Sequence, residues 1–304
     1  MFRTVTVYSG EKVSVKQNWM VVSGADGEHR LPVEDIYSVV IDNRQTLLTA
    51  PFITTLTKAG AHILICDEKH LPASVILPQS IHYHPLTVMR KQIALPEDIK
   101  DKLWDRIARQ KILNQAKVLE LCGGKRERCA RLRELAEEVK DGDAGNREGI
   151  AARIFFHELY GYEFVRFYDD AINAALNYGY TVIRSAVAKT LTAYGYNCVL
   201  GLHHINEANP FNLADDVMEP LRPIVDMWVS DHHEDLVDAL TKQQRNELAA
   251  LVNQLVLWDG KKMRLRNALD KYVSSLTTAI NNLSPAKLKL PEMIRTDLYN
   301  EEDD

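Results

Sequence analysis

The spacing of apolar residues changes once along this chain of 304 residues, at about residue 85. Before that point the apolar residues form short alternating or β-branched runs, such as RTVTV, KVSV, WMVV, DIYSVVI and HILIC. Runs of this kind, separated by turn residues, predict β-strands. After that point apolar residues recur at helical spacing over long stretches, which predicts amphipathic helices. We therefore expect an α+β protein, with a small N-terminal β domain followed by a large all-α C-terminal domain.

The same change of pattern places the boundaries between the parts. We assign residues 1–80 to the β domain, 81–95 to a linker and 96–304 to the helical domain. Within the first part, VTVYSGEKVSV is expected to form a hairpin, and PFITTLTKAG a short helix that ends at Gly60. Within the second part, QQRNELAALVNQLVLW is expected to be one of the helices.

Composition narrows the class of protein. Hydrophobic residues make up 46% and charged residues 26%, which is the balance of a soluble globular protein. No run approaches the roughly 20 apolar residues of a membrane helix, and the N-terminal residues do not resemble a signal peptide. We therefore expect a cytoplasmic protein with no membrane partner. A formal net charge of −5 argues against a generic nucleic-acid binder, although a local positive face can coexist with it.

The first segment with residues suited to chemistry is NREGIAARIFF. Asn146 is a suitable N-cap, which places Glu148 in the first turn of a helix. Ala151, Ala152 and Phe155 share the face of Glu148, so that face is expected to point inward. The alternative is structural, because an acid near a helix N-terminus is stabilised by the helix dipole.

The second segment is GLHHIN, which contains His203 and His204. Adjacent side chains of an extended chain point in opposite directions, so one histidine can face a site while the other faces solvent or DNA. The alternative is one buried structural histidine beside a surface one.

The third segment is LADDVMEPLRPIVD. Four charged residues fall on one helical face: Asp215, Glu219, Arg222 and Asp226. Such a stripe is often merely solvated, but Pro220 and Pro223 would each remove a helical hydrogen bond and indicate a bend. Its apolar stripe predicts a deeply packed helix with the acids at the edge of that stripe.

Together these segments offer a carboxylate, an imidazole and a second carboxylate. An oxygen-rich set with one nitrogen suits Mn²⁺ or Mg²⁺ better than a structural zinc ion. The run from Asp231 to Glu234, DHHE, is a weaker alternative metal site. The absence of Walker-type, Gly-x-Ser-x-Gly and dinucleotide motifs argues against nucleotide hydrolysis, serine esterase chemistry and hydride transfer.

With these motifs in order, the sequence resembles the CRISPR adaptation integrase, the first of the CRISPR-associated proteins, in its type II form. The resemblance lies in NREGIAARIFF, NYGYTVIRS, GLHHINEANPFNLADDVMEPLRPIVD and CDEKHLPASVILP, and it extends over nearly the whole chain. It implies that Glu148, His204 and Glu219 are the catalytic metal ligands. His204 is chosen over His203 because it is the one in the family's ligand position ahead of Asn206.

The resemblance also implies an activity and its partners. The family inserts short duplex DNA fragments into a CRISPR array by transesterification of their 3′ hydroxyls, and its metal centre can also cut DNA. It implies Mn²⁺ or Mg²⁺ as cofactor and a homodimer formed through the β domain. It further implies bridging by the small second CRISPR-associated protein, and contact with other type II CRISPR proteins.

Basic side chains would hold the DNA phosphates. The candidates are Arg147, Arg153 and Arg222 near the metal, and Arg90 and Lys91 near the linker. Two other functions remain open at this point: a DNA-binding scaffold without catalysis, and a metal-dependent phosphoesterase that acts on small molecules.

Overall fold

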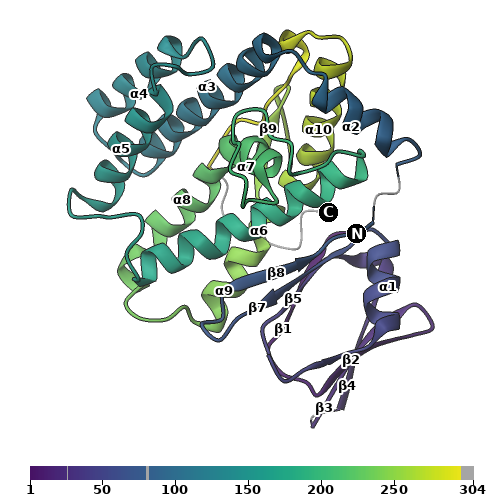
Figure 1. Cartoon of the computed structure of the whole chain (residues 1–304). Coiled ribbons are helices and arrows are strands. Elements are labelled where there is room, and N and C mark those ends of the chain that lie inside the picture. The colour runs from purple at the N-terminus through teal and green to yellow at the C-terminus, as the bar shows by residue number, and fades with distance from the viewer. Residues whose placement is uncertain (26, 80–81, 296–304) are drawn as a thin grey trace.

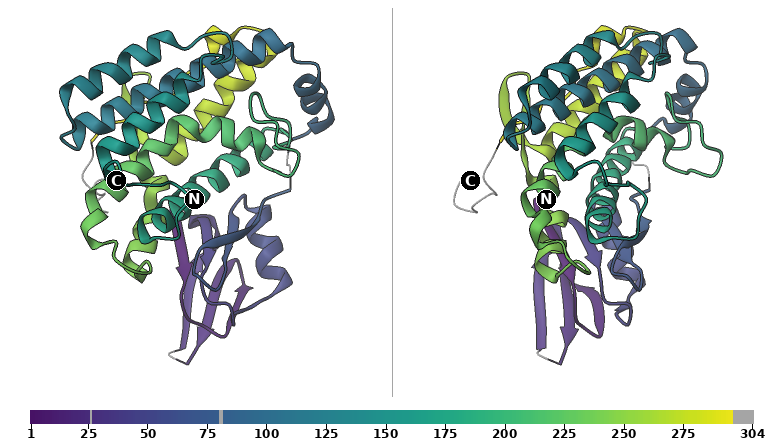
Figure 2. Two further views of the ribbon diagram at one scale, coloured as in Figure 1. Left: turned by 60° about the vertical axis from the view of Figure 1, so that its left-hand side comes forward. Right: turned by 90° about the vertical axis from the view of Figure 1, so that its left-hand side faces the viewer.

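The computed structural model describes residues 1–25, 27–79 and 82–295, with a strand-rich N-terminal part and a helical C-terminal part (Figure 1). Figure 2 shows that the helices of the C-terminal part gather at one end of the strand-rich part. The predicted α+β class is confirmed. Residues 80–81, at the predicted domain boundary, and residues 296–304, at the end of the predicted helical domain, lie outside the described residues.

The strand-rich part contains two four-stranded sheets. In one sheet the first three strands are parallel and the last is antiparallel, in the order β1 (Arg3–Val7), β5 (Ile36–Ile41), β7 (His62–Cys66) and β8 (Pro72–Ile76). The order in the other sheet is β4 (Gly27–Pro32), β3 (Trp19–Gly24), β2 (Lys12–Lys16) and β6 (Leu47–Leu48). Helix α1 (Ala50–Lys58) is followed by Gly60 at φ +90°, as predicted.

The predicted hairpin over VTVYSGEKVSV is wrong, because its two halves belong to different sheets. Strand β1 pairs with β5, whereas β2 pairs with β3 and β6. Gly10, at φ +124°, lies in the turn that carries the chain from one sheet to the other. Val7 and Val13 then pack in a single apolar cluster with Phe52 and Leu56 of α1. Burial against this shared core replaces direct pairing of the two strands.

Nine α-helices lie after residue 84 in the described chain. They are α2 (Pro85–Ile93), α3 (Glu97–Leu121), α4 (Arg126–Glu138), α5 (Arg147–Tyr160), α6 (Ala171–Ala193), α7 (Asn212–Met218), α8 (Arg222–His232), α9 (Lys242–Ala250) and α10 (Leu265–Asn281). Helix α2 occupies most of the stretch predicted as a linker. Short 3₁₀ turns are η1 (Val33–Asp35), η2 (Glu219–Leu221), η3 (His233–Asp235), η4 (Leu251–Asn253) and η5 (Pro285–Lys287).

The C-terminal part is not wholly helical. The predicted helix QQRNELAALVNQLVLW stops at α9 and η4, and its last residues form strand β9 (Leu255–Trp258). Strand β9 pairs antiparallel with β10 (Lys261–Arg264). Asp259 and Gly260 between them have φ of 53° and 76°, the conformation of a two-residue hairpin turn for which Asp-Gly is a favoured pair.

Polar contacts join the two parts. Nε of Arg245, in α9, lies 2.9 Å from a carboxylate oxygen of Asp42, and both side chains are buried. The hydroxyl of Tyr8 donates to the carbonyl of Lys242 at 2.8 Å. Helix α6 lies along β7 and β8 (Figure 1). Among the described residues, none of the helices has both the length and the apolar content needed to cross a bilayer.

Candidate metal centre

Lys111 of α3 lies inside the helical part, only 7% exposed, between the carboxylates of Glu148 and Glu219. Its ammonium forms an ion pair with each of them. Burial alone would lower the pKa of Lys111, but the two carboxylate charges outweigh it and raise that pKa. Two acids from different elements therefore meet at one positive charge.

Glu148 is held in place through the backbone at the start of α5. The side chain of Asn146 accepts a hydrogen bond from the N–H of Gly149 at 3.2 Å, so the predicted N-cap is confirmed. Asp143, which the sequence did not suggest, accepts from the N–H groups of Arg147 at 2.8 Å and Glu148 at 2.9 Å. These bonds satisfy donors that a helix N-terminus leaves unpaired.

Glu219 lies in a break between α7 and α8, and the predicted bend is confirmed. Pro220 and Pro223 have no N–H to donate to the carbonyls of Asp216 and Glu219. Those carbonyls instead accept from the N–H groups of Glu219 and Arg222, which forms the tight 3₁₀ turn η2. The break carries Glu219 toward α3.

Helix α3 is tied to this turn by a buried amide. The side chain of Asn114 donates to the carbonyls of Pro220, at 2.7 Å, and Pro291, at 3.1 Å. It also accepts from the N–H of Met293 at 3.1 Å. Because Asn114 follows Lys111 by three residues, the same helical face carries the ammonium and the amide that positions η2.

The charges around Glu219 keep it ionised. Glu219 is 4% exposed, and Nε of Arg222 lies 2.7 Å from one of its oxygens. Burial raises the pKa of a carboxyl group, but the charges of Arg222 and Lys111 outweigh it and lower the pKa of Glu219. The Arg222 guanidinium also lies 4.7 Å from the ring centroid of Tyr180. Arg222, expected to contact DNA, is therefore bonded to the candidate ligand.

Asp226 is a second buried acid in this region. It is 1% exposed and accepts a hydrogen bond from the hydroxyl of Tyr180. Burial raises the pKa of Asp226 to about 7, despite that bond and the nearby charges of Lys111 and Arg222. The predicted position of the acids at the edge of an apolar stripe is thus wrong for Glu219 and Asp226. Both of them are buried instead.

His204 is oriented by Asp216, a fully buried residue that the sequence did not single out. Nδ1 of His204 lies 2.7 Å from an oxygen of Asp216, whose carboxylate also accepts from the N–H groups of Leu202, His203 and His204. The Asp216 hydrogen bond, aided by the charges of Glu219 and Asp215, raises the pKa of His204. Nδ1 is engaged by Asp216, so Nε2 is the nitrogen suited to a metal.

The rings of the two adjacent histidines are nearly perpendicular, and both of them contact Trp104. The ring of His203 stacks on Trp104 with centroids 4.2 Å apart, while the His204 ring is turned 89° from it. Trp104 and Lys111 are seven residues apart on α3 and lie on the same helical face. Helix α3 therefore contacts both the histidine loop and the two glutamates.

The three predicted ligands are only partly assembled. Glu148 and Glu219 meet at Lys111, but the described residues contain no group of three His, Cys, Asp or Glu side chains close enough to hold one ion. This includes the alternative site at residues 231–234, where the His232 and His233 rings face the carbonyls of Trp228 and Ser230. Two carboxylates around one charge, with an imidazole nearby, nevertheless fit the oxygen-rich donor set of Mn²⁺ or Mg²⁺.

Lys111, like Asp143 and Asp216, was not predicted from the sequence. It follows Ile107 by four residues and precedes Val118 by seven, so it falls within the apolar stripe of its helix. A lysine at such a position is almost never fully buried unless it is paired. The position of Lys111 within an apolar stripe indicates a buried, paired lysine, but it does not indicate which residues are its partners.

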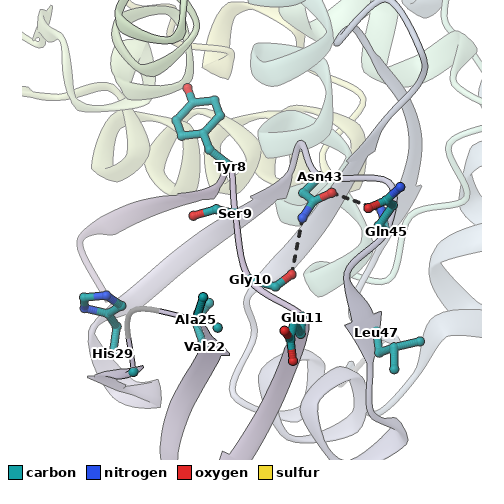
Figure 3. A pocket seen from close by; sticks show the side chains of 12 residues that line it. Tyr8, Ser9, Gly10, Glu11, Val22, Ala25, His29, Asn43, Gln45 and Leu47 are labelled. Carbon is teal, nitrogen blue, oxygen red and sulfur yellow. Dashed lines mark hydrogen bonds between the residues drawn. The ribbon is translucent and has the colours of Figure 1, made fainter.

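An open cavity of about 620 Å³ lies elsewhere, in the strand-rich part. Its lining includes Tyr8, His29 and Leu47 (Figure 3). Asn43 also lines the cavity, and its side chain donates to the carbonyl of Gly10 at 3.3 Å and accepts from the N–H of Gln45 at 3.1 Å. All of its lining residues belong to the strand-rich part, so the cavity is separate from the Lys111 cluster.

Comparison with known proteins places the chain in a family. The profile of the CRISPR associated protein Cas1 family matches residues 5–254. The CRISPR-associated endonuclease Cas1 of Neisseria meningitidis serogroup C (strain 8013) is 40% identical over 303 residues, which are 99% of each chain.

Two solved structures share the fold. A casposase bound to integration product has a TM-score of 0.74 at 19% identity, over 97% of this chain and 95% of that one. A chain of a Cas6-RT-Cas1–Cas2 complex has a TM-score of 0.74 at 18% identity, over 96% of this chain. The match spans 36% of that longer chain. From the family profile and the 40% identical relative, the chain belongs to the Cas1 family of CRISPR associated proteins.

Proposed function

We propose that this chain is a divalent-metal-dependent DNA integrase and endonuclease that inserts short duplex fragments into a CRISPR array. The observation that carries the proposal is the convergence of Glu148 and Glu219 on one buried positive charge. Such convergence is required of two carboxylates that bind one cation. The 40% identical relative is named an endonuclease, which supports the same class of chemistry.

The residues of the site have separate roles in this proposal. Glu148 and Glu219 would anchor Mn²⁺ or Mg²⁺, and His204 would complete the ligand set through Nε2 or carry a proton. Asp216 would hold the His204 ring in the required tautomer. A divalent ion bound there would lower the pKa of a hydroxyl nucleophile and stabilise the charge on the attacked phosphate.

The proposed reaction is a transesterification. The 3′ hydroxyl of the incoming duplex attacks a phosphodiester of the repeat, a new P–O bond forms, and the bond to the original 3′ oxygen breaks. The buried surroundings of Glu219 would limit the access of water, which would otherwise compete as the nucleophile. With water as the nucleophile, the same centre would cut DNA.

The partners follow from the proposed activity. They are duplex DNA, a second copy of the chain joined through the strand-rich part, and the small second CRISPR-associated protein as a bridge. Similar solved chains come from a Cas6-RT-Cas1–Cas2 complex and from a casposase bound to integration product. The first supports the small second CRISPR-associated protein as a partner, and the second supports DNA. The type II form, contact with other type II proteins and a cytoplasmic location belong to the same proposal. Among the suggested DNA contacts, Arg90, Lys91 and Arg153 are exposed.

The test is joining of a short duplex to a repeat-bearing plasmid in Mn²⁺ and in EDTA. Glu148→Gln and Glu219→Gln should abolish the Mn²⁺-dependent joining. Glu127→Gln is the matched control, because Glu127 is also in the first turn of a helix but is exposed. Equal results in Mn²⁺ and EDTA would favour a scaffold, and hydrolysis of nucleotide monoesters without duplex binding would favour a phosphoesterase.

A further inference from the structure

The ammonium of Lys111 occupies the place between the two carboxylates that are proposed to bind the metal. Lys111 is 7% exposed and contacts Glu148 on one side and Glu219 on the other. Glu148 comes from the start of α5, and Glu219 from the turn between α7 and α8. The contact to Lys111 therefore links three separate elements of the helical part.

A positive charge is needed at this place in the absence of an ion. Two carboxylates that share a buried site repel each other. Arg222 balances Glu219 alone, since its Nε lies 2.7 Å from that residue. The Lys111 ammonium contacts both acids, so its charge offsets the repulsion between them.

A divalent ion needs the same oxygen lone pairs. Mn²⁺ and Mg²⁺ bind carboxylate oxygens directly at about 2 Å. An ammonium held between two carboxylates leaves no room there for a second cation, and the two positive charges would also repel. Lysine is suited to withdrawal, because its charge is compact and is carried on a flexible four-carbon stem.

We propose that Lys111 is an internal counter-ion that takes the metal position in the metal-free protein and leaves it when the ion binds. This inference rests on the proposed function for the identity of the ligands. Its consequence is that the ion competes with the protein's own cation. The measured affinity for the divalent ion is therefore lower than the affinity of the same ligands without Lys111. It equals that intrinsic affinity multiplied by the fraction of molecules in which Lys111 has left the position.

The first test is the Mn²⁺ dissociation constant of the full chain, measured from the free Mn²⁺ signal in electron paramagnetic resonance. Lys111→Met should bind Mn²⁺ at least about tenfold more tightly than the wild type, because a competitor is removed. Lys117→Met is the matched control, since Lys117 is on the same helix but pairs with Glu120 at the surface. It should leave the constant unchanged. An unchanged or weaker affinity in Lys111→Met overturns the proposal.

The second test is thermal unfolding in EDTA and in saturating Mn²⁺. Lys111→Met should unfold at a lower temperature than the wild type in EDTA, because its two glutamates repel each other. Mn²⁺ should raise the unfolding temperature of Lys111→Met by more than it raises that of the wild type, because a ligand that binds more tightly stabilises the folded state more. An equal gain in the two proteins overturns the proposal. Lys111→Gln, which keeps a hydrogen-bond donor, gives the same comparison if Lys111→Met does not fold without the ion.

Failure of the proposed function has a different signature. If Glu219→Gln binds Mn²⁺ as tightly as the wild type, the metal ligands are assigned wrongly and the inference falls with them. If Lys111→Met binds Mn²⁺ more tightly but the wild type joins no duplex, the counter-ion role stands and the integrase activity does not.

Discussion

Asp216 holds His204 at two points: its carboxylate lies 3.1 Å from the backbone nitrogen of His204 and 2.7 Å from Nδ1 of the ring. The same carboxylate accepts the N–H groups of Leu202 and His203. One buried acid therefore fixes both the path of the loop and the direction of its ring. A carboxylate bonded to one ring nitrogen in this way sets the tautomer of a histidine and leaves the other nitrogen available to a ligand.

Replacing Asp216 should weaken both the fold and the ion site. In Asp216→Asn, an amide NH₂ faces backbone donors and one acceptor oxygen is lost. We expect a fall in the free energy of unfolding of about 2–4 kcal/mol, because buried N–H groups lose a charged partner. Denaturant unfolding and Mn²⁺ titration check this. Asp238→Asn, at an exposed position, is the control, and equal behaviour of the two variants would contradict the role of Asp216.

The same loop should not tolerate a side chain at Gly201. A Cβ there would lie 2.2 Å from the carbonyl oxygen of His204 and 2.9 Å from a carboxylate oxygen of Asp216. Gly201→Ala should therefore displace His204, destabilise the protein by about 1–3 kcal/mol and weaken Mn²⁺ binding. Gly145→Ala is the control, because its Cβ would meet only the flexible end of Arg147. A Gly201→Ala variant with wild-type melting temperature and Mn²⁺ affinity would show that the loop adapts.

The two glutamates should differ in their effect on the metal-free protein. Glu219 is bonded to two cations and its side chain is 5% exposed, whereas the side chain of Glu148 is 24% exposed. Glu219→Gln leaves Lys111 and Arg222 with unbalanced buried charge, which typically costs about 3–5 kcal/mol. Denaturant unfolding in EDTA should show a smaller loss for Glu148→Gln.

The pH dependence of the Glu219 contribution follows from its lowered pKa. A carboxyl group whose pKa is lower in the folded state stabilises the protein above its unfolded pKa and loses that effect as the pH falls through the folded value. The difference in the free energy of unfolding between wild type and Glu219→Gln should therefore become smaller as the pH falls into the acid range. A gap that stays constant down to pH 3 would contradict this.

Asp226 should show the opposite pH dependence. Because burial raises its pKa to about 7, the folded state binds a proton that the unfolded state has released. Between the ordinary carboxyl pKa and about pH 7, this group therefore destabilises the wild type by about 1.4 kcal/mol per pH unit as the pH rises. Relative to wild type, Asp226→Asn should gain stability over that window and then level off. Denaturant unfolding at several pH values measures this, and a flat difference would contradict it.

Much of the fold was predictable because its signals are local. The long helices from α3 to α6 follow directly from helical spacing, and the N-cap at Asn146 and the helix end before Gly60 follow from single residues. The hairpin errors have the same origin. A turn at Gly10 does not reveal which sheet each strand joins, and the apolar run LVLW before Asp259-Gly260 suits a strand as well as a helix.

The α+β class, the bend at the two prolines and the residue types available for a metal follow from the order of residues along the chain. The tertiary structure alone decided that Lys111 separates Glu148 from Glu219 and that Asp216 orients His204. Periodicity and caps depend on neighbours within a few residues, whereas Lys111 and Glu148 are 37 positions apart. Such contacts form only when α3 packs against α5 and η2.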